Sequence, residues 1–175
     1  MAYISKGDDR SRMHDPQLID VIAGLPREQF SGEVFRATRL NADPTAFSNN
    51  GGRWAPSSDG RYSVQVLYTS LARDGALAEV ASYLSLLIPL PSKPLCVHRL
   101  RVTTTRTLRI VRADFGALGI IDRLYSEREY ARTQEIGAIV SFLECDGRGG
   151  SVCLNRLDGL ISGSSAGFYA AARSG

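Results

Sequence analysis

The residues of this chain that could do chemistry together lie within one stretch, residues 32–84. Arg36 falls inside a predicted strand, Arg53 in a Gly-Gly-Arg-Trp loop, and Tyr68 at the end of a second strand. Glu79 follows on a predicted helix, about 120° from the centre of its apolar stripe, so its carboxylate borders the buried face. A carboxylate in that position is usually paired or functional, and arginine grips phosphate through two parallel hydrogen bonds. These four residues therefore form the candidate site.

Each of these residues also has a purely structural interpretation. Glu79 alone could be a surface residue or part of an ion pair, and Arg53 could be a loop residue stacked on Trp54. The chain holds nineteen arginines and two lysines, and codon bias is the simpler explanation of that excess. A net charge of +3 does not favour bulk binding of nucleic acid, which needs a denser basic face. The combination of the four residues is a stronger indication of function than any one of them.

The composition excludes several classes of protein. The chain has 175 residues, 43% of them hydrophobic and 22% charged, which fits one domain. It has no apolar run of the length, about 20 residues, that a transmembrane helix needs, and its N-terminus lacks the apolar segment of a secretory signal. Three cysteines, Cys96, Cys145 and Cys153, are too few and odd in number for a disulfide scaffold. We therefore expect a cytoplasmic protein outside the membrane, fibrous and disordered classes.

The expected elements mix helices and strands without an internal repeat. Helices are predicted from Pro16 to near Gly24, over residues 75–88 and over residues 127–143, and strands over residues 33–37, 64–69, 95–104, 107–111, 152–154 and 157–161. A buried stripe on the second helix is predicted from the spacing of Leu77, Val80, Ala81, Leu84 and Ile88. A slip in the apolar phase near His98 predicts a bulge. This mixture predicts a single α+β domain.

The domain is expected to span residues 14–161. Residues 1–13 are predicted to form a polar leader. Residues 162–175 are predicted to form a tail of small residues that could include an Ala-rich turn of helix. Residues 41–63 are rich in Asn, Asp, Ser, Gly and Pro, which predicts a long loop, and a loop of this length in a compact domain is usually functional.

The sequence does not support other known catalytic or ligand-binding motifs. Gly163-Ser164-Ser165-Ala166-Gly167 matches the nucleophile elbow of hydrolases, but that chemistry needs a later histidine, and both histidines, His14 and His98, come earlier. Cys96 and His98 are more readily explained as strand residues than as a catalytic pair. The sequence has no zinc spacing, no phosphate-binding loop and no dinucleotide fingerprint, so any bound phosphate must be held by side chains.

Four short motifs, in this order, resemble the RES domain family, which is named for its arginine, glutamate and serine. They are Val34-Phe35-Arg36-Ala37, Gly51-Gly52-Arg53-Trp54-Ala55, Val66-Leu67-Tyr68-Thr69-Ser70 and Ala76-Leu77-Ala78-Glu79-Val80. The resemblance is strong over residues 32–84 and diffuse from 94 to 161. The family serine is carried onto Ser151, with Ser141 as the second choice, and Gly150 stands where the family has a proline.

The resemblance implies a fold like that of ADP-ribosyltransferases, an α+β domain of mixed sheets with flanking helices. Members of the family are bacterial toxins that pair with a helix-turn-helix antitoxin of the Xre type. They deplete NAD or transfer ADP-ribose from it. The resemblance therefore implies NAD as the substrate, no metal, and an Xre-type antitoxin as the partner, without a membrane or direct nucleic-acid role.

The same resemblance assigns roles to the site residues. Glu79, Arg53 and Ser151 are expected to be catalytic, and Arg36, Arg53, Tyr68 and Ser151 to bind NAD. Cleavage of the nicotinamide–ribose bond develops positive charge on the ribose, which a carboxylate such as that of Glu79 stabilises. The two arginines would hold the pyrophosphate, Tyr68 would stack on nicotinamide or ribose, and Ser151 would bond the amide or ribose.

The acceptor is left open by the residues. Water or phosphate would make the chain an NAD hydrolase or phosphorylase, which is the first hypothesis. A protein side chain would make it a protein ADP-ribosyltransferase. A third hypothesis, from a different class, is a non-catalytic RES-like module that binds an acidic partner or nucleic acid.

Overall fold

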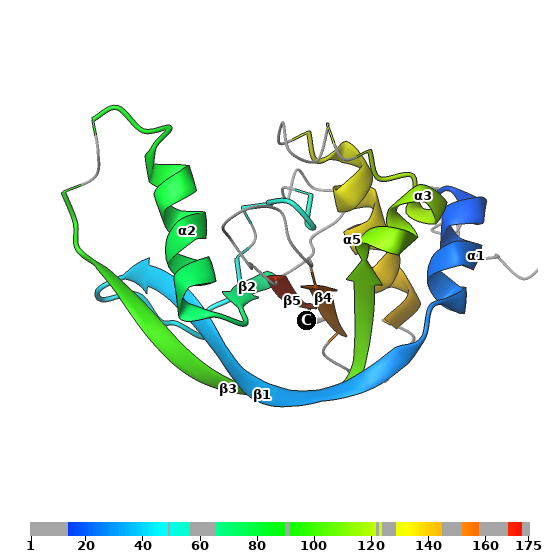
Figure 1. Cartoon of the computed structure of the whole chain (residues 1–175), viewed down its shortest axis with the longest axis horizontal. Coiled ribbons are helices and arrows are strands. Elements are labelled where there is room, and N and C mark those ends of the chain that lie inside the picture. Colours follow the sequence, from blue (N-terminus) through cyan, green and yellow to red (C-terminus); the bar gives the residue numbers. More distant parts are fainter. Residues whose placement is uncertain are drawn as a thin grey trace, which may run out of the picture.

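We describe a computed structural model of the chain over residues 14–48, 50–56, 66–89, 92–121, 123, 129–144, 152–157 and 168–172. Its elements, in chain order, are α1 (Pro16–Gly24), β1 (Arg27–Arg39), β2 (Val66–Ser70), α2 (Arg73–Leu84), β3 (Leu95–Val111), the 3-10 turn η2 (Arg112–Asp114), α3 (Phe115–Leu118), α5 (Ala131–Glu144), β4 (Val152–Leu157) and β5 (Phe168–Ala172). The predicted α+β class is confirmed by this mixture (Figure 1).

The fold is organised by a long antiparallel ribbon of β1 and β3, which curves beneath all the other elements (Figure 1). Its pairing runs from Arg39 opposite Leu95 to Arg27 opposite Leu108. The sequence predicted two strands here and a bulge near His98. The structure has one strand, in which His98 pairs regularly with Arg36, and the register shifts farther along, where residues 28–30 face 104–107. The extra residue of β3 lies between Thr104 and Thr107, which are both buried and whose hydroxyls contact each other at 2.5 Å.

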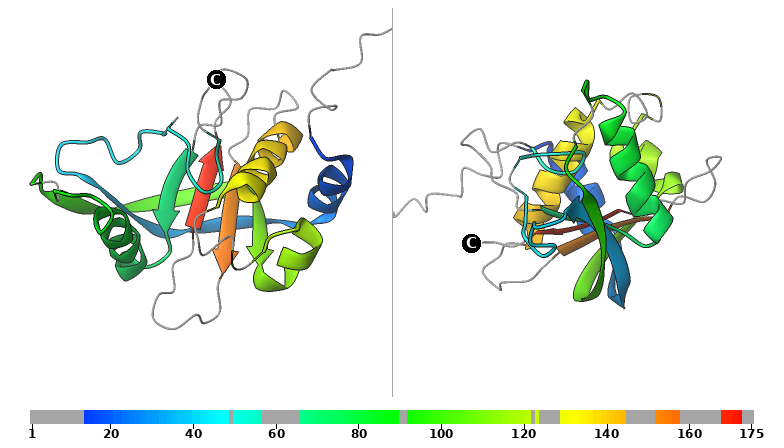
Figure 2. Two further views of the ribbon diagram at one scale, coloured as in Figure 1. Left: turned by 90° about the horizontal axis from the view of Figure 1, so that it is seen from above. Right: turned by 90° about the vertical axis from the view of Figure 1, so that its left-hand side faces the viewer.

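The remaining strands complete a closed ring in the order β1-β2-β5-β4-β3 (Figure 2). β2 meets β1 only at Phe35 opposite Ser70 but pairs along its whole length with β5. β4 lies parallel to β3 and antiparallel to β5. The segment 168–172, which the sequence analysis placed in a tail with a turn of helix, is therefore a strand between β2 and β4. Pairing on both sides outweighs the local helix propensity of its alanines.

One half of the ribbon carries the hydrophobic core beneath α1, α3 and α5 (Figure 1). Its fully buried members include Leu18, Ile22, Leu108, Ile136 and Ile139. α1 begins as the sequence predicts, with Pro16 in the first turn and the Asp15 side chain accepting a hydrogen bond from the Gln17 N–H at 3.0 Å. Among the described residues, no helix has the length and apolar character needed to cross a membrane.

Among the described elements, α2 is the one that covers the other half of the ribbon (Figure 1), and here the prediction is wrong in two respects. The helix ends at Leu84 and does not continue to residue 88. Its buried residues are Gly75 and Ala76, whereas Leu77 is 39% exposed and Ile88 is 97% exposed. The periodic spacing predicted a buried stripe along the helix, but α2 meets the sheet through the small residues of its first turn, Gly75 and Ala76.

Candidate functional site

A groove of about 260 Å³ lies between α2 and the meeting point of β1 and β2. Three of the predicted site residues line it together: Arg36 from β1, Tyr68 from β2 and Glu79 from α2. Thr69 and Ser70 of β2 line it as well. Residues from three separate elements therefore converge on one hollow, as the sequence analysis expected for Arg36, Tyr68 and Glu79.

The convergence follows from how the elements connect. Pairing of Phe35 with Ser70 brings the middle of β1 beside the end of β2. Two residues separate the end of β2 at Ser70 from the start of α2 at Arg73, so the second turn of α2 returns over the strand ends and brings Glu79 to the groove. The helix approaches closely because Gly75 and Ala76, both small, are the residues it buries.

Tyr68 occupies a tight position at the back of the groove. Its hydroxyl accepts a hydrogen bond from the Trp54 N–H at 3.3 Å. A Cβ on Gly52 would lie 2.5 Å from the same hydroxyl, so only glycine fits there without a shift. Burial raises the pKa of Tyr68, against the lowering effect of the Trp54 and Ala55 backbone N–H groups. The phenol is therefore neutral at pH 7 and keeps its own proton to donate.

Two charges of opposite sign act on that hydroxyl. The charge of Arg53 lowers the pKa of Tyr68 and the charge of Glu79 raises it, while burial is the largest influence. Tyr68 thus lies within electrostatic reach of both residues. Glu79 is exposed to solvent at the groove. Tyr68 therefore feels the charge of both the loop arginine and the helix carboxylate.

The loop that carries Arg53 is held by the core and by α5. Trp54 is 2% exposed and packs in the main hydrophobic cluster. Thr133 donates from Oγ1 to the Arg53 carbonyl at 2.5 Å, and Gln134 donates from Nε2 to the Gly52 carbonyl at 2.9 Å. A Cβ on Gly137 of α5 would lie 1.7 Å from the Trp54 carbonyl oxygen. The segment Gly52–Trp54 of the predicted loop is therefore fixed in place by the buried tryptophan and by α5.

The Arg53 side chain stacks on an aromatic ring, as its structural interpretation expected, but on a different one. Its guanidinium carbon lies 4.9 Å from the centre of the ring of Tyr130, which comes just before α5. Arg53 is not among the residues that line the groove itself. Tyr130 was missed by the sequence analysis because it is 77 positions away in the chain, and no local pattern marks it.

The Arg36 guanidinium holds a loop by hydrogen bonds and also lines the groove. One of its terminal nitrogens donates to the carbonyls of Pro44 at 2.8 Å and Ala46 at 2.7 Å, which fastens the loop after β1. Burial lowers the pKa of Arg36 and the neighbouring Asp43 carboxylate raises it. A guanidinium has five N–H donors, so those two hydrogen bonds leave three for an anion in the groove.

Among the described residues that line the groove, Thr69 has a buried hydroxyl without a hydrogen-bond partner. Its side chain is 95% removed from solvent (5% exposed), and its Oγ1 has no hydrogen-bond partner. Buried hydroxyls are nearly always hydrogen-bonded, so an unpaired one beside a candidate site points to a missing ligand or water. Sequence analysis did not single out this residue, since a threonine at the end of a strand is ordinary.

The remaining predicted residues lie elsewhere. Ser151 falls outside the described residues, as does the rejected elbow motif at residues 163–167. Ser141 is on α5, partly buried, and is not among the residues that line the groove. His98 contacts the Thr38 hydroxyl through Nε2 at 2.9 Å, across β3 and β1. In the described ranges, no three side chains of His, Cys, Asp and Glu gather in a metal-binding arrangement.

Comparison with known proteins places this geometry in a family. The model of the RES domain family matches residues 33–159. The crystal structure of the M. tuberculosis MbcT–MbcA toxin–antitoxin complex contains a chain of similar fold, with a TM-score of 0.69 and 16% sequence identity. The alignment covers 91% of this chain and 82% of that one. A search of the curated proteins finds no match.

Proposed function

The chain belongs to the RES domain family, and on that premise we propose that it is a toxin that cleaves the nicotinamide–ribose bond of NAD. The observation that carries the proposal is the convergence of Glu79, Tyr68 and Arg36 on one groove. That groove offers a carboxylate, a neutral phenol and an arginine with unused N–H donors.

The reaction needs an anion beside the sugar. As the bond between the ribose anomeric carbon and the pyridinium nitrogen breaks, its electron pair leaves with nicotinamide and positive charge spreads over the ribose. The Glu79 carboxylate would stabilise that charge from the rim of the groove. An oxygen of water or hydrogen phosphate then bonds to the anomeric carbon and loses its proton to solvent, giving ADP-ribose or its 1″-phosphate.

The other residues would hold the dinucleotide. Arg36 would bind the pyrophosphate with its three remaining N–H donors. Arg53, whose charge acts on Tyr68, would add a second positive charge near the groove. Tyr68 would place its ring or hydroxyl against the nicotinamide riboside. Ser151 remains the proposed serine of the family, with a role toward the amide or ribose.

The partner belongs to the same proposal. The similar fold was found in a complex of a toxin with its antitoxin, which supports a protein antitoxin for this chain too. Its helix-turn-helix, Xre-type character follows from the family resemblance. Co-expression of the gene with its neighbour tests this directly: growth arrest by the chain alone, relieved by the neighbour, is the expected result.

The central experiment is incubation of the pure, antitoxin-free chain with NAD, with and without phosphate. Release of nicotinamide is expected, and Glu79→Gln or Arg53→Ala should abolish it. A well-folded sample that releases none under either condition overturns the hydrolase and phosphorylase forms of the proposal. Labelled ADP-ribose appearing on a protein instead of in solution would favour a protein ADP-ribosyltransferase, because the exposed Glu79 leaves room for a protein acceptor.

A further inference from the structure

The candidate groove continues along α2 beyond the proposed cleavage site. It shares Ala37 and Val80 with a second hollow of about 450 Å³. That hollow shares Arg39 and Lys93 with a third, of about 400 Å³. We call the three together the long groove. It begins at Glu79 and ends where β1 finishes and β3 is about to start.

The middle of the long groove is apolar. Val80, Leu84 and Leu87 line it from α2 and the turn that follows, and Tyr83 presents an aromatic ring that is 61% exposed. Val80 and Leu84 belong to the stripe that the sequence predicted to be buried, and in the structure they are only partly buried. An apolar wall with one exposed ring suits the flat face of a heterocyclic base.

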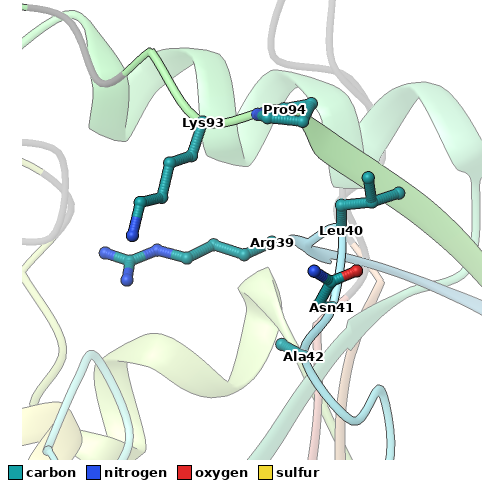
Figure 3. A pocket seen from close by; sticks show the side chains of 6 residues that line it. All are labelled: Arg39, Leu40, Asn41, Ala42, Lys93 and Pro94. Atoms are coloured by element: carbon teal, nitrogen blue, oxygen red, sulfur yellow. The ribbon is translucent and has the colours of Figure 1, made fainter.

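The far end of the long groove carries two positive charges. Figure 3 shows the side chains of Arg39 and Lys93 extended in the same direction, with their charged ends close together in that view. Both are exposed, and no described carboxylate pairs with either of them. Two cations that line one hollow repel each other unless an anion lies between them.

The spacing of the positive groups is also informative. Arg36 and Arg39 are three residues apart on β1, so their backbones are separated by about 10 Å at roughly 3.3 Å per residue. A ligand lying in the long groove would therefore meet a cationic group beside the cleavage site, an apolar wall, and a second cationic group. In NADP the adenosine ribose follows the pyrophosphate and carries both the adenine and the 2′-phosphate. With the pyrophosphate at Arg36, the adenine would lie on the apolar wall and the 2′-phosphate at the second cationic group.

We propose that Arg39 and Lys93 form a subsite for the 2′-phosphate of NADP, which makes the phosphorylated dinucleotide a substrate of this chain. The inference rests on the proposed cleavage of NAD, which supplies the orientation of the ligand. Arginine and lysine are the side chains that hold phosphate monoesters in proteins, through charge-assisted hydrogen bonds. In this groove they serve the substrate end that is not cleaved.

Binding measured by calorimetry tests the subsite without relying on catalysis. Adenosine 2′,5′-bisphosphate, which has no nicotinamide to lose, is titrated into the wild-type chain, and NAD and NADP into the Glu79→Gln variant. NADP should bind about tenfold more tightly than NAD, and Arg39→Gln with Lys93→Gln should remove that advantage. The affinity for NAD should change by less than about twofold, as should all affinities in Arg109→Gln, a matched loss of one exposed arginine elsewhere on β3.

The other outcomes are decisive as well. Equal affinity for NAD and NADP, or bisphosphate binding that ignores both substitutions, overturns the subsite. Displacement of the bisphosphate by an equal concentration of inorganic phosphate would show that the cations hold free phosphate, and would overturn the assignment to NADP. Nicotinamide release from NADP that does not depend on Arg39 and Lys93 leaves the proposed function standing and removes the subsite. If bisphosphate binding needs both Arg39 and Lys93 but the chain releases no nicotinamide, the phosphate subsite stands and the proposed function is overturned.

Discussion

The backbone N–H of Trp54 donates to the hydroxyl of Tyr68 at 3.3 Å, which ties a tryptophan of the hydrophobic core to a tyrosine of the candidate groove. Trp54 holds the loop in the core, and Tyr68 lines the candidate groove. The position of Arg53, which lies between Gly52 and Trp54 in the sequence, therefore depends on core packing as well as on the loop. Several predictions about stability and about the site depend on this link.

The contact between α5 and the loop should be sensitive to a single methyl group. Gly137→Ala places a Cβ 1.7 Å from the Trp54 carbonyl oxygen, so the helix or the loop must move. We expect a loss of unfolding free energy of about 2 kcal/mol or more, measured by urea unfolding. Gly116→Ala is the matched control: its Cβ meets nothing within 4 Å, and alanine there should be neutral or slightly stabilising. Equal effects of the two substitutions would contradict the close approach.

Gly52 and Tyr68 should show energetic coupling. Gly52→Ala brings a Cβ within 2.5 Å of the Tyr68 hydroxyl, and should destabilise the chain by roughly 1–3 kcal/mol. Removal of that hydroxyl by Tyr68→Phe should make the same glycine substitution less costly. A double-mutant cycle of unfolding free energies measures the coupling. Additive losses would mean that the added Cβ is opposed by the Tyr68 ring, whose Cζ would lie 2.9 Å away, and not by the hydroxyl.

Tyr68 should make stability depend on alkaline pH. Because burial raises its pKa in the folded chain, the folded state holds this proton at a pH where the unfolded chain has begun to lose it. The contribution is complete below the unfolded pKa of about 10 and is lost as pH rises above it. Urea unfolding of the wild type and of Tyr68→Phe between neutral pH and pH 11 should show the steeper decline in the wild type. Parallel curves would contradict the burial of the hydroxyl.

Glu79 should matter for chemistry and little for stability. Its side chain is exposed, and ion pairs in solvent contribute about 0–1 kcal/mol, so Glu79→Gln should change the unfolding free energy by no more than that. Thermal and urea unfolding measure it beside the nicotinamide assay. A loss above about 3 kcal/mol is typical of a broken buried pair and would assign Glu79 a structural role.

The unpaired hydroxyl of Thr69 gives an unusual expectation for a buried threonine. Thr69→Val keeps the shape and removes a hydroxyl that has no partner, so the unfolding free energy should stay level or rise. Thr69→Ser keeps the hydroxyl but loses a methyl group, and should cost about 0.5–1.5 kcal/mol, as for a comparable loss in a core. Chemical unfolding of the two variants gives the order directly. If valine proves the worse of the two, the hydroxyl has a partner in the folded chain.

Much of the site was predictable because its residues sit in local patterns. Arg36, Tyr68 and Glu79 lie close together in sequence, and the order of strand, loop, strand and helix is written in turn residues and apolar spacing. Tyr130 and Thr69 were not predictable. Tyr130 contacts Arg53 from 77 positions away in the chain. Thr69 is distinguished only by a buried hydroxyl that lacks a hydrogen-bond partner.

The sequence by itself determined the α+β class, the cap of α1 at Asp15, and the family motifs that name the candidate site. These are local matters of propensity, capping and residue order. Tertiary structure alone decided that β5 is a strand, that the apolar face of α2 stays uncovered, and that Arg39 and Lys93 share a hollow. Such outcomes depend on which surfaces meet. A periodic pattern predicts the face a helix can bury, but only the partner element decides whether there is anything to bury it against.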